Sequence, residues 1–298
     1  MKKLEGVLPI VPTPFAETGA PDLAALRRVV GDAVRAGAAA LVYPGVASED
    51  VHMTAAERGT CLDAVIDAAG GRLPVIAGVN SADPAEMVAL AQGVARQGAQ
   101  GIMAMAVPAM RGDLTGWFAR LAEATGGLPI ILQNLFAPRG ADLSGAEMIA
   151  LARAVPAIRY VKEEGIPSGP KVSELVAACG PDMDAVIGGG GARYLLEELD
   201  RGAVATMPAI ELLDLHVALM AAYRAGRRDL ALDLYERSLP LLLIQAPYRM
   251  RLTKLILKHR GLIDCDAVRE PLPEMDEALE RLVIELYQRA TAPETADA

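Results

Sequence analysis

The chain has 298 residues, of which 52% are hydrophobic, 22% are charged and 4% are aromatic, and its formal net charge is −9. A composition this apolar argues against a disordered chain, and a negative charge with no basic stripe argues against nucleic acid as a partner. The length suits one large α/β barrel or two ordinary domains. The abundance of alanine, leucine and valine favours helices packed on a parallel sheet.

The cysteines and the N-terminus indicate where the protein works. Cys61, Cys179 and Cys265 are far apart and form no Cys-x-x-Cys pair, which favours buried free thiols in a reducing compartment over a metal or redox site. The N-terminus enters a strand-like run directly, without a signal-peptide pattern, and no apolar stretch reaches membrane-spanning length. We therefore expect a cytoplasmic protein with no membrane partner.

Strand-like and helical segments alternate along the chain. Apolar strand-like runs are predicted at residues 6–11, 39–43, 74–79, 101–105, 129–133, 157–162, 184–188 and 203–206. The segments between them have helical periodicity and helix-start signals. Asp22 precedes a predicted helix at 23–36, a capping box opens another at 54–69, and Asp83-Pro84 places proline at the first position of a third.

This alternation predicts the architecture. Strands that alternate with helices imply parallel strands joined by right-handed crossovers, and eight units predict an α/β fold of the (β/α)8 TIM-barrel type over residues 1–210. An open doubly wound sheet is the alternative, but the glycine run at 188–191 follows a late strand and lacks dinucleotide-binding spacing. Residues 211–298 predict a C-terminal helical region packed on the barrel, with helices at 211–225, 228–245, 248–259 and 275–288.

Lys162 ends the sixth predicted strand, and two acids, Glu163 and Glu164, follow it. In a TIM barrel the active site lies at the carboxyl ends of the strands. Removal from water disfavours the charged form of an amine, and a neutral lysine attacks a carbonyl to form a Schiff base. A lysine that extends into solvent at a strand end is the alternative interpretation.

Other chemistries lack the residues that they require. The histidines His52, His216 and His259 are isolated, although His52 follows the second strand. No phosphate-binding lysine loop, GxSxG elbow or HExxH motif occurs. Lys162 is therefore the only strong candidate nucleophile, and we expect neither a metal nor a cofactor.

As a set, several stretches resemble the dihydrodipicolinate synthase/N-acetylneuraminate lyase family of Schiff-base aldolases. They are Gly6-Val7 through Thr13-Pro14-Phe15, the Gly45–Glu49 loop with Thr54 and Glu57-Arg58, Pro74–Val79, Asn134 and Val161-Lys162-Glu163. The resemblance covers nearly the whole chain and implies a barrel with a helical C-terminal region, usually assembled as a homotetramer, a dimer of dimers. It also implies that Lys162 forms an imine with the keto group of pyruvate or another 2-keto acid.

The chain departs from that family at two positions. Where the family carries a pair of hydroxyl residues after the loop glycine, this chain has Val46 and Ala47, with a hydroxyl one residue later at Ser48. Where the family carries its catalytic tyrosine, this chain has Gln133. An amide hydrogen-bonds but does not shuttle protons near neutral pH, which argues against dihydrodipicolinate synthase activity.

A subgroup, L-2-keto-3-deoxyarabonate dehydratase, looks similar at these same places. It shares the Ser-Glu pair after the second strand, the glutamine in place of tyrosine, the run from Lys162 to Lys171 and stretches at 252–254, 261–263 and 269–273. The resemblance predicts dehydration of a 2-keto-3-deoxy sugar acid. A pyruvate-dependent aldolase and a 2-keto-acid-binding relative without turnover are the alternatives.

The expected site residues follow from this hypothesis. The substrate carboxylate would bind backbone N–H groups of Gly45, Val46 and Ala47 and the Ser48 hydroxyl. Proton transfer would fall to Ser48 with a water, to Glu49 or to Glu164. Glu49 is, however, more typical of a helix cap or an arginine partner, and Glu163 of an ion pair.

The remaining candidates surround the imine. Gln133 and Asn134 would hold a substrate hydroxyl or a water, while Gly188 and Thr206 would line the pocket, Thr206 opposite Lys162. Arg139 and Lys171 would bind a distal group or face solvent, of which solvent is the favoured interpretation.

Overall fold

The computed structural model describes residues 3–292. Its parallel strands form one sheet in the order β1-β8-β7-β6-β5-β4-β3-β2. Ile10 forms a parallel bridge with Val42, and the Val11 amide donates to the Val42 carbonyl at 3.0 Å, so the two ends of this order meet. The predicted TIM barrel is confirmed, with these strands: β1 Gly6–Val7, β2 Leu41–Val42, β3 Val75–Gly78, β4 Gly101–Met105, β5 Ile130–Asn134, β6 Ile158–Glu163, β7 Ala185–Gly188 and β8 Ala205–Thr206.

The first predicted strand is regular only at Gly6–Val7, which is shorter than expected. Pro9 has no amide hydrogen to donate to a ladder, so the regular pairing stops there. The chain still runs beside its neighbours, because the Leu8 amide donates to the Thr206 carbonyl at 2.9 Å and the Ile10 amide to the Pro208 carbonyl at 2.9 Å.

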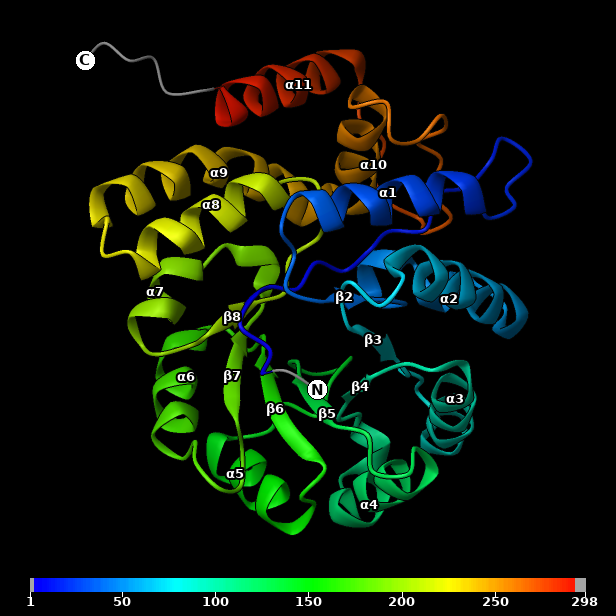
Figure 1. The fold of residues 1–298 in the computed structure, drawn as a ribbon, viewed down its shortest axis with the longest axis vertical. Helices are drawn as coiled ribbons and strands as arrows, with labels where there is room; N and C mark the ends of the chain where they lie inside the picture. Colours follow the sequence, from blue (N-terminus) through cyan, green and yellow to red (C-terminus); the bar gives the residue numbers. More distant parts are fainter. Residues whose placement is uncertain (1–2, 293–298) are drawn as a thin grey trace.

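Helices surround the strands (Figure 1), and the three helix starts that the sequence predicts, at residues 23, 54 and 84, are met to within one residue. The Asp22 side chain accepts from the amides of Ala24 and Ala25, and Thr54 forms the expected capping box with Glu57. These helices are α1 Leu23–Arg35, α2 Ala55–Ala69, α3 Pro84–Gln97, α4 Leu114–Ala124, α5 Gly145–Ala154, α6 Ser168–Ala177 and α7 Leu195–Asp200.

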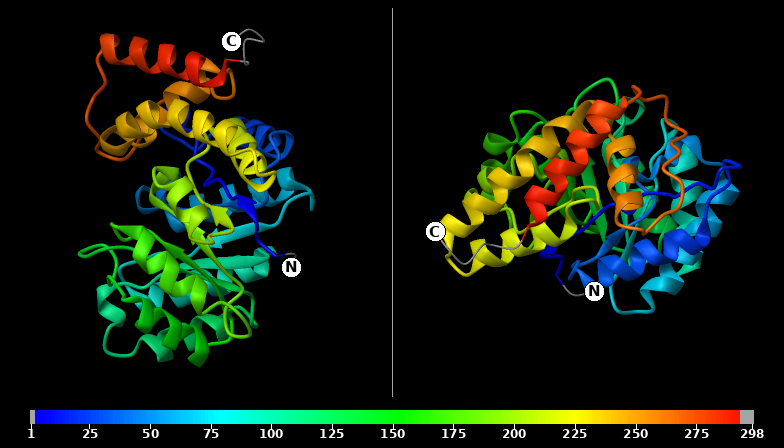
Figure 2. Two further views of the ribbon diagram at one scale, coloured as in Figure 1. Left: turned by 90° about the vertical axis from the view of Figure 1, so that its left-hand side faces the viewer. Right: turned by 90° about the horizontal axis from the view of Figure 1, so that it is seen from above.

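The C-terminal helices gather at one side of the barrel (Figures 1 and 2). They are α8 Leu213–Arg224, α9 Arg228–Tyr248, α10 Met250–His259 and α11 Glu277–Thr291. The expected helix start at residue 248 is wrong, because Arg249, with a φ of 45°, separates α9 from α10. The division at residue 210 stays a prediction, and the end of the 211–298 region lies outside the described residues.

Two apolar clusters lie on opposite faces of the strands. The cluster inside the barrel includes Ile76, Met103, Ile131 and Tyr160. The other cluster, to which Leu132 belongs, lies between the strands and the outer helices. Because successive strand residues point to opposite faces, Lys162 lies on the same inner face as Tyr160. The barrel interior below Lys162 is therefore filled with side chains, and chemistry is confined to the strand ends.

The sequence also predicts buried cysteines and no segment that crosses a membrane. Cys61 is buried as predicted, but Cys179 and Cys265 are only partly buried, so the expectation of a buried thiol is wrong for these two. None of the helices within residues 3–292 combines the length and the apolar character needed to cross a bilayer.

Candidate active site

Lys162 reaches into a cavity of about 400 Å³ at the carboxyl ends of the strands. The lysine is 1% exposed, so the expected removal from water is confirmed. Val46 and Ala47, from the loop after β2, line the wall together with residues of α9 and α10, which come from the C-terminal part of the chain. The C-terminal helices therefore contribute directly to the cavity, in addition to packing on the barrel.

A carboxylate lies beside the amine. The Nζ atom of Lys162 is 3.1 Å from Oε2 of Glu164, whose side chain is 15% exposed in the cavity wall. Nε2 of Gln133 donates to the same carboxylate oxygen at 2.6 Å. The lysine, the acid and the amide thus meet at one point, as three predicted site residues.

The position of Gln133 is fixed by a further amide. Nδ2 of Asn80 donates to Oε1 of Gln133 at 3.1 Å, and the Met105 amide donates to Oδ1 of Asn80 at 2.8 Å. A continuous line of hydrogen bonds therefore joins the main chain of β4 to Glu164. Sequence reasoning gave Asn80 no role, although its place after the third strand was the available signal.

Local geometry explains why these side chains converge. Gln133 and Lys162 are Cα partners on the neighbouring strands β5 and β6, so both point inward at one level. Glu164 follows the strand, and its side chain lies over Gly189, where an added Cβ would come within 2.2 Å of Glu164 Cγ. Glycine at 189 leaves the room that the carboxylate occupies.

The loop after β2 contributes Val46 and Ala47 to the cavity wall. Ser48 Oγ donates to the Val11 carbonyl at 2.5 Å and accepts from the Gly45 amide at 3.0 Å. Ser48 is 0% exposed and, like Gly45, does not line the cavity, unlike Val46 and Ala47. The structure therefore gives no support to a proton-carrying role for the Ser48 hydroxyl, which stays a prediction.

Glu49 lies in a separate, fully enclosed ion pair. Its Oε1 is 2.6 Å from Nζ of Lys254, and both side chains are 0% exposed. Oε2 accepts from the backbone amides of Arg269 at 2.6 Å and Glu270 at 2.8 Å. The expected ion-paired role fits this arrangement, but the partner is a lysine of α10, so the expectation of an arginine partner or a helix cap is wrong.

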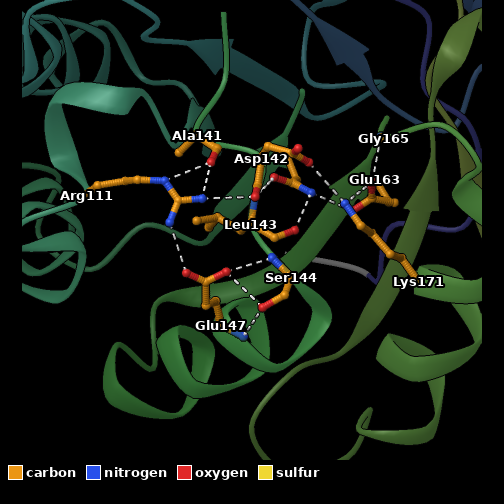
Figure 3. Close-up of polar contacts among 10 residues, drawn as sticks. Arg111, Ala141, Asp142, Leu143, Ser144, Glu147, Glu163, Gly165 and Lys171 are labelled. Carbon is orange, nitrogen blue, oxygen red and sulfur yellow. Dashed lines mark hydrogen bonds and ion pairs between the residues drawn. The ribbon is translucent and has the colours of Figure 1, made fainter. Parts of the chain in front are cut away.

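Asn134 and Glu163 do not line the cavity and belong to a polar network behind β5 and β6. Figure 3 shows the part of this network around Glu163. Nδ2 of Asn134 donates to Glu163 at 2.9 Å and to the Leu143 carbonyl at 3.1 Å. Lys171 is 3.9 Å from Glu163 and 3.3 Å from Asp142, so the expected ion pair of Glu163 is confirmed. Burial raises the pKa of Glu163.

The same network holds the loop after β5, which carries Arg139 at the cavity wall. Arg111 donates to the Ala141 carbonyl at 3.0 Å through Nε and to Glu147 at 3.2 Å through Nη1 (Figure 3). Arg139 borders the cavity but is exposed, in agreement with the favoured expectation that it faces solvent, and its binding of a distal group stays a prediction. Lys171 is engaged in ion pairs outside the cavity.

Three predicted contacts lie elsewhere. Asn134, Gly188 and Thr206 do not line the cavity, since each is next to an inward residue of its strand and so faces outward. His52 does not line it either; its carbonyl accepts from Arg269. Substrate contact at these positions stays a prediction that this arrangement does not favour.

Sequence reasoning missed a group of residues on the cavity wall, namely Arg193, Gln245 and Arg249. They come from the segment after β7 and from the α9–α10 junction, distant in sequence from Lys162. No pattern in the chain marks them. Within residues 3–292 the structure contains no group of three or more His, Cys, Asp and Glu side chains that would hold a metal.

Comparisons with known proteins show the family to which this sequence is similar. Residues 3–289 match the Dihydrodipicolinate synthetase family. The chain is 30% identical to L-2-keto-3-deoxyarabonate dehydratase from Azospirillum brasilense over 279 residues, which cover 91% of this chain and 89% of that protein. It is 28% identical to 4-hydroxy-tetrahydrodipicolinate synthase from Thermus thermophilus over 290 residues, 93% of this chain and 94% of that one.

Solved structures give the same result. Dihydrodipicolinate synthase from Rhodopseudomonas palustris superposes with a TM-score of 0.88 at 26% identity, covering 96% of this chain and 97% of that one. N-acetylneuraminate lyase from Proteus mirabilis superposes with a TM-score of 0.85 at 16% identity, covering 97% and 99%, a likeness of fold alone.

Proposed function

The chain belongs to the dihydrodipicolinate synthetase family of lyases, and from this we propose that it forms a Schiff base on Lys162 and dehydrates a 2-keto-3-deoxy sugar acid. The observation that carries the proposal is the contact of 3.1 Å between the enclosed Lys162 amine and the Glu164 carboxylate. An amine and a carboxylate in one cavity provide the nucleophile and the proton carrier that such a reaction needs.

The first half of the reaction makes the imine. The Lys162 nitrogen attacks C2 of the 2-keto acid, and the carbonyl oxygen leaves as water after proton transfer, which Glu164 is placed to assist. The positive iminium then withdraws electrons from the C2–C3 bond, so that a C3 proton becomes acidic. Main-chain N–H groups beside Val46 and Ala47 are the candidates to bind the adjoining carboxylate.

The second half removes water. Glu164 takes the C3 proton, giving an enamine, and the C4 hydroxyl leaves as water when it receives a proton, giving a C3–C4 double bond conjugated with the iminium. Hydrolysis of that iminium releases the product and restores Lys162. Gln133, held by Asn80, keeps the Glu164 carboxylate at the place where it can act.

The position of Glu164 favours turnover over binding alone, and the choice of dehydration over aldol cleavage rests on the resemblance to a dehydratase. The family tyrosine is replaced by Gln133, which cannot carry a proton, but Gln133 donates to the one acid in the cavity wall. The 30% identity to a 2-keto-3-deoxyarabonate dehydratase supports the same choice. A cytoplasmic homotetramer remains part of the proposal, to be checked by sedimentation of the purified protein.

Borohydride reduction with intact-mass measurement tests the proposal. We expect a covalent adduct with pyruvate and with 2-keto-3-deoxy sugar acids in the native chain, and none in Lys162→Met. An adduct that has lost water from the sugar acid indicates dehydration, whereas a pyruvate-sized adduct from the same acid indicates aldol cleavage. Native protein that gives no adduct with any of these acids would rule out the imine.

Glu164→Gln separates imine formation from turnover. At the end point of trapping it should still give the pyruvate adduct, more slowly than the native chain, because Lys162 remains, while dehydration falls by about 10²- to 10⁴-fold, the usual contribution of a general acid–base. Asp142→Asn is the matched control, because Asp142 pairs with Lys171 outside the cavity and should leave turnover unchanged. Full turnover in Glu164→Gln would show that another group carries the proton.

A further inference from the structure

The wall of the cavity carries an excess of positive charge. Four cationic side chains, Arg139, Lys162, Arg193 and Arg249, line it together with a single acid, Glu164. The chain as a whole has a net charge of −9, so this concentration of positive charge is local. A cavity lined in this way attracts anions and disfavours cations.

Arg193 is held in place by neutral groups. Its Nε donates to the Leu242 carbonyl at 2.8 Å, its Nη1 to the Gly190 carbonyl at 2.6 Å and its Nη2 to the side-chain oxygen of Gln245. Among residues 3–292 no carboxylate forms an ion pair with it. A guanidinium has more N–H groups than these three contacts use, so donors remain for a ligand.

The charge of Arg193 is also poorly compensated. Burial lowers the pKa of Arg193, and the like charge of Arg249 lowers it further, against the opposing effect of Glu211. Two guanidinium groups near one another in a half-buried wall repel each other, and an anion between them would relieve that repulsion.

Arg249 lies at a backbone position that is unfavourable for a residue with a Cβ. Its φ of 45° and ψ of −117° separate α9 from α10 and place the residue at the cavity wall. Its Nε is 3.4 Å from Oε2 of Glu270, and neither atom makes a hydrogen bond within the described residues. The pair is therefore loose, and the guanidinium has donors left for a ligand. Backbone strain of this kind is common at ligand sites.

Two groups of lining residues differ in chemistry. The first, around Lys162, holds Glu164 and Gln133, which serve the keto group and C3 in the proposed reaction. Arg193 and Arg249 line the same cavity from the segment after β7 and the α9–α10 junction, and within the described residues no hydrogen bond or ion pair joins either of them to Lys162 or Glu164. Binding of the keto acid's own carboxylate by the loop after β2, as proposed above, leaves these arginines for a second group of the substrate.

We propose that Arg193 and Arg249 form a second anion subsite, and that the substrate is a 2-keto-3-deoxy sugar diacid with a carboxylate at its distal end. The inference rests on the proposed function and narrows its substrate class. A planar, forked guanidinium matches a carboxylate in two-point contact, which favours a distal carboxylate over a distal hydroxyl.

Two 2-keto-3-deoxy acids of equal length, one ending in a carboxylate and the other in a hydroxymethyl group, test the inference. In the native enzyme we expect kcat/KM to be about tenfold or more higher for the diacid. Arg193→Gln should lower kcat/KM for the diacid by about 10- to 100-fold, as expected for loss of a charged hydrogen bond. It should change kcat/KM for the hydroxymethyl acid by less than about twofold. Equal losses for both acids would overturn the subsite.

Pyruvate and a 2-keto-3-deoxy acid with a terminal phosphate ester provide two further tests of the subsite. Pyruvate trapping by borohydride should be unchanged in Arg193→Gln; a matching loss would show that Arg193 binds the keto acid's own carboxylate instead. An acid with a terminal phosphate ester that reacts faster than the diacid would overturn the choice of carboxylate.

Controls separate charge from folding. Arg193→Lys keeps the charge but loses the forked contact, so it should retain at most part of the preference for the diacid, whereas an equal fall in kcat/KM for both acids in this variant would indicate a merely structural role. Arg251→Gln is the matched arginine control, because Arg251 contacts Leu272 and Glu274 outside the cavity wall.

Binding to Lys162→Met, measured by calorimetry, keeps this inference distinct from the proposed function. That variant forms no imine but retains both arginines, so it should still bind the diacid more tightly than the hydroxymethyl acid. Equal affinities there would overturn the subsite even if the native enzyme forms its imine. Tighter binding of the diacid with no imine in the native chain would instead uphold the subsite and reject the proposed function.

Discussion

Two lysine–glutamate pairs of the same chemical composition lie in different surroundings in this molecule. Lys162 and Glu164 are 3.1 Å apart at the cavity, with the acid 15% exposed. Lys254 and Glu49 are 2.6 Å apart, with both side chains 0% exposed. One pair is open to a ligand, and the other excludes it.

Their hydrogen bonds explain the difference. The Glu49 carboxylate accepts two backbone amides, and Lys254 donates to the Ala267 carbonyl at 2.8 Å and lies 4.1 Å from the ring centre of Phe15. Lys162 has no comparable set of partners within the described residues. A buried pair with every partner satisfied fixes structure, whereas a pair open to a cavity keeps an amine available for chemistry.

The location of the enclosed pair gives it a structural purpose. Glu49 directly follows the loop whose Val46 and Ala47 line the cavity, and Lys254 belongs to α10. The pair therefore joins the C-terminal helices to the loop after β2. We expect it to set the position of that loop without taking part in the reaction.

The largest expected effect is on activity. Lys162→Met should reduce turnover by about 10³-fold or more, because it removes the nucleophile. It should change the free energy of unfolding by less than about 1 kcal/mol, since Glu164 keeps its bond to Gln133 and partial access to water. Product assays and urea unfolding measure the two quantities. A loss of stability as large as that expected for Lys254→Met would remove the contrast.

The next effect is on stability. Lys254→Met should lower the free energy of unfolding by about 3–5 kcal/mol, because it leaves the Glu49 carboxylate buried without a cation. Trapping of pyruvate by the folded fraction should persist. Urea unfolding is the measurement, and the matched control is Lys258→Met, which removes an exposed partner of Asp266 and should cost less than about 1 kcal/mol.

A double variant tests the cause. Lys254→Met combined with Glu49→Gln removes both charges and should recover at least half of the lost stability. If the double variant is as unstable as the sum of the two single variants, the loss comes from packing and the pair is not the reason.

Glu198 is a third acid to compare with Glu49 and Glu164, since it is buried and forms no ion pair within the described residues. Glu198 is 1% exposed, accepts a hydrogen bond from Ser168 at 3.1 Å, and has its pKa raised from 4.5 to about 7, mainly by burial. Because the unfolded chain releases this proton near pH 4.5 and the folded chain near pH 7, stability should fall as the pH rises between these values. The loss is about 3 kcal/mol at most.

Glu198→Gln should abolish that part of the pH dependence. At pH 5 its free energy of unfolding should be close to that of the native chain, and at pH 8 it should be higher by up to about 3 kcal/mol. Urea unfolding across this range supplies the measurement. Parallel pH profiles for the two proteins would contradict the account of Glu198 as a buried, protonated acid.

The smallest expected effect is on stability and concerns Arg269, whose backbone amide donates to Glu49 of the enclosed pair. Arg269 contacts Glu57 through two nitrogens, at 2.6 and 3.0 Å, and lies 4.3 Å from the ring centre of Phe15. Arg269→Lys keeps the charge but loses the forked contact and the stacking, so it should lower the free energy of unfolding by about 1 kcal/mol. Thermal unfolding against Arg281→Lys, an exposed helix pair, is the test. Equal losses of stability in Arg269→Lys and Arg281→Lys would show that the two-point contact between Arg269 and Glu57 adds no stability.

The strand and helix pattern could be predicted from sequence because it depends on local periodicity. The barrel, the capping of α1 and α2, and the place of Lys162 at the end of β6 are confirmed. The predicted helix start at residue 248 and the predicted length of the first strand differ from the structure. Arg249, with a φ of 45°, interrupts the helix, and Pro9 lacks the amide hydrogen that a strand needs. Hydrophobic periodicity carries no information about either backbone feature.

The site was only partly predictable. Spacing places Gln133, Lys162 and Glu164 at neighbouring strand ends, and these do meet. It does not by itself separate inward from outward residues, so Asn134, Gly188 and Thr206 were expected in the cavity and lie behind it.

The sequence alone therefore determined which side chains stand at the ends of the strands, since that depends on short-range periodicity and turn signals. Only the tertiary structure decided which of two similar lysines is open to a ligand, and that Arg193 and Arg249 share a wall with Lys162. Those features depend on how α9 and α10 pack across the strand ends. Such packing joins residues far apart in the chain, and no local pattern encodes it.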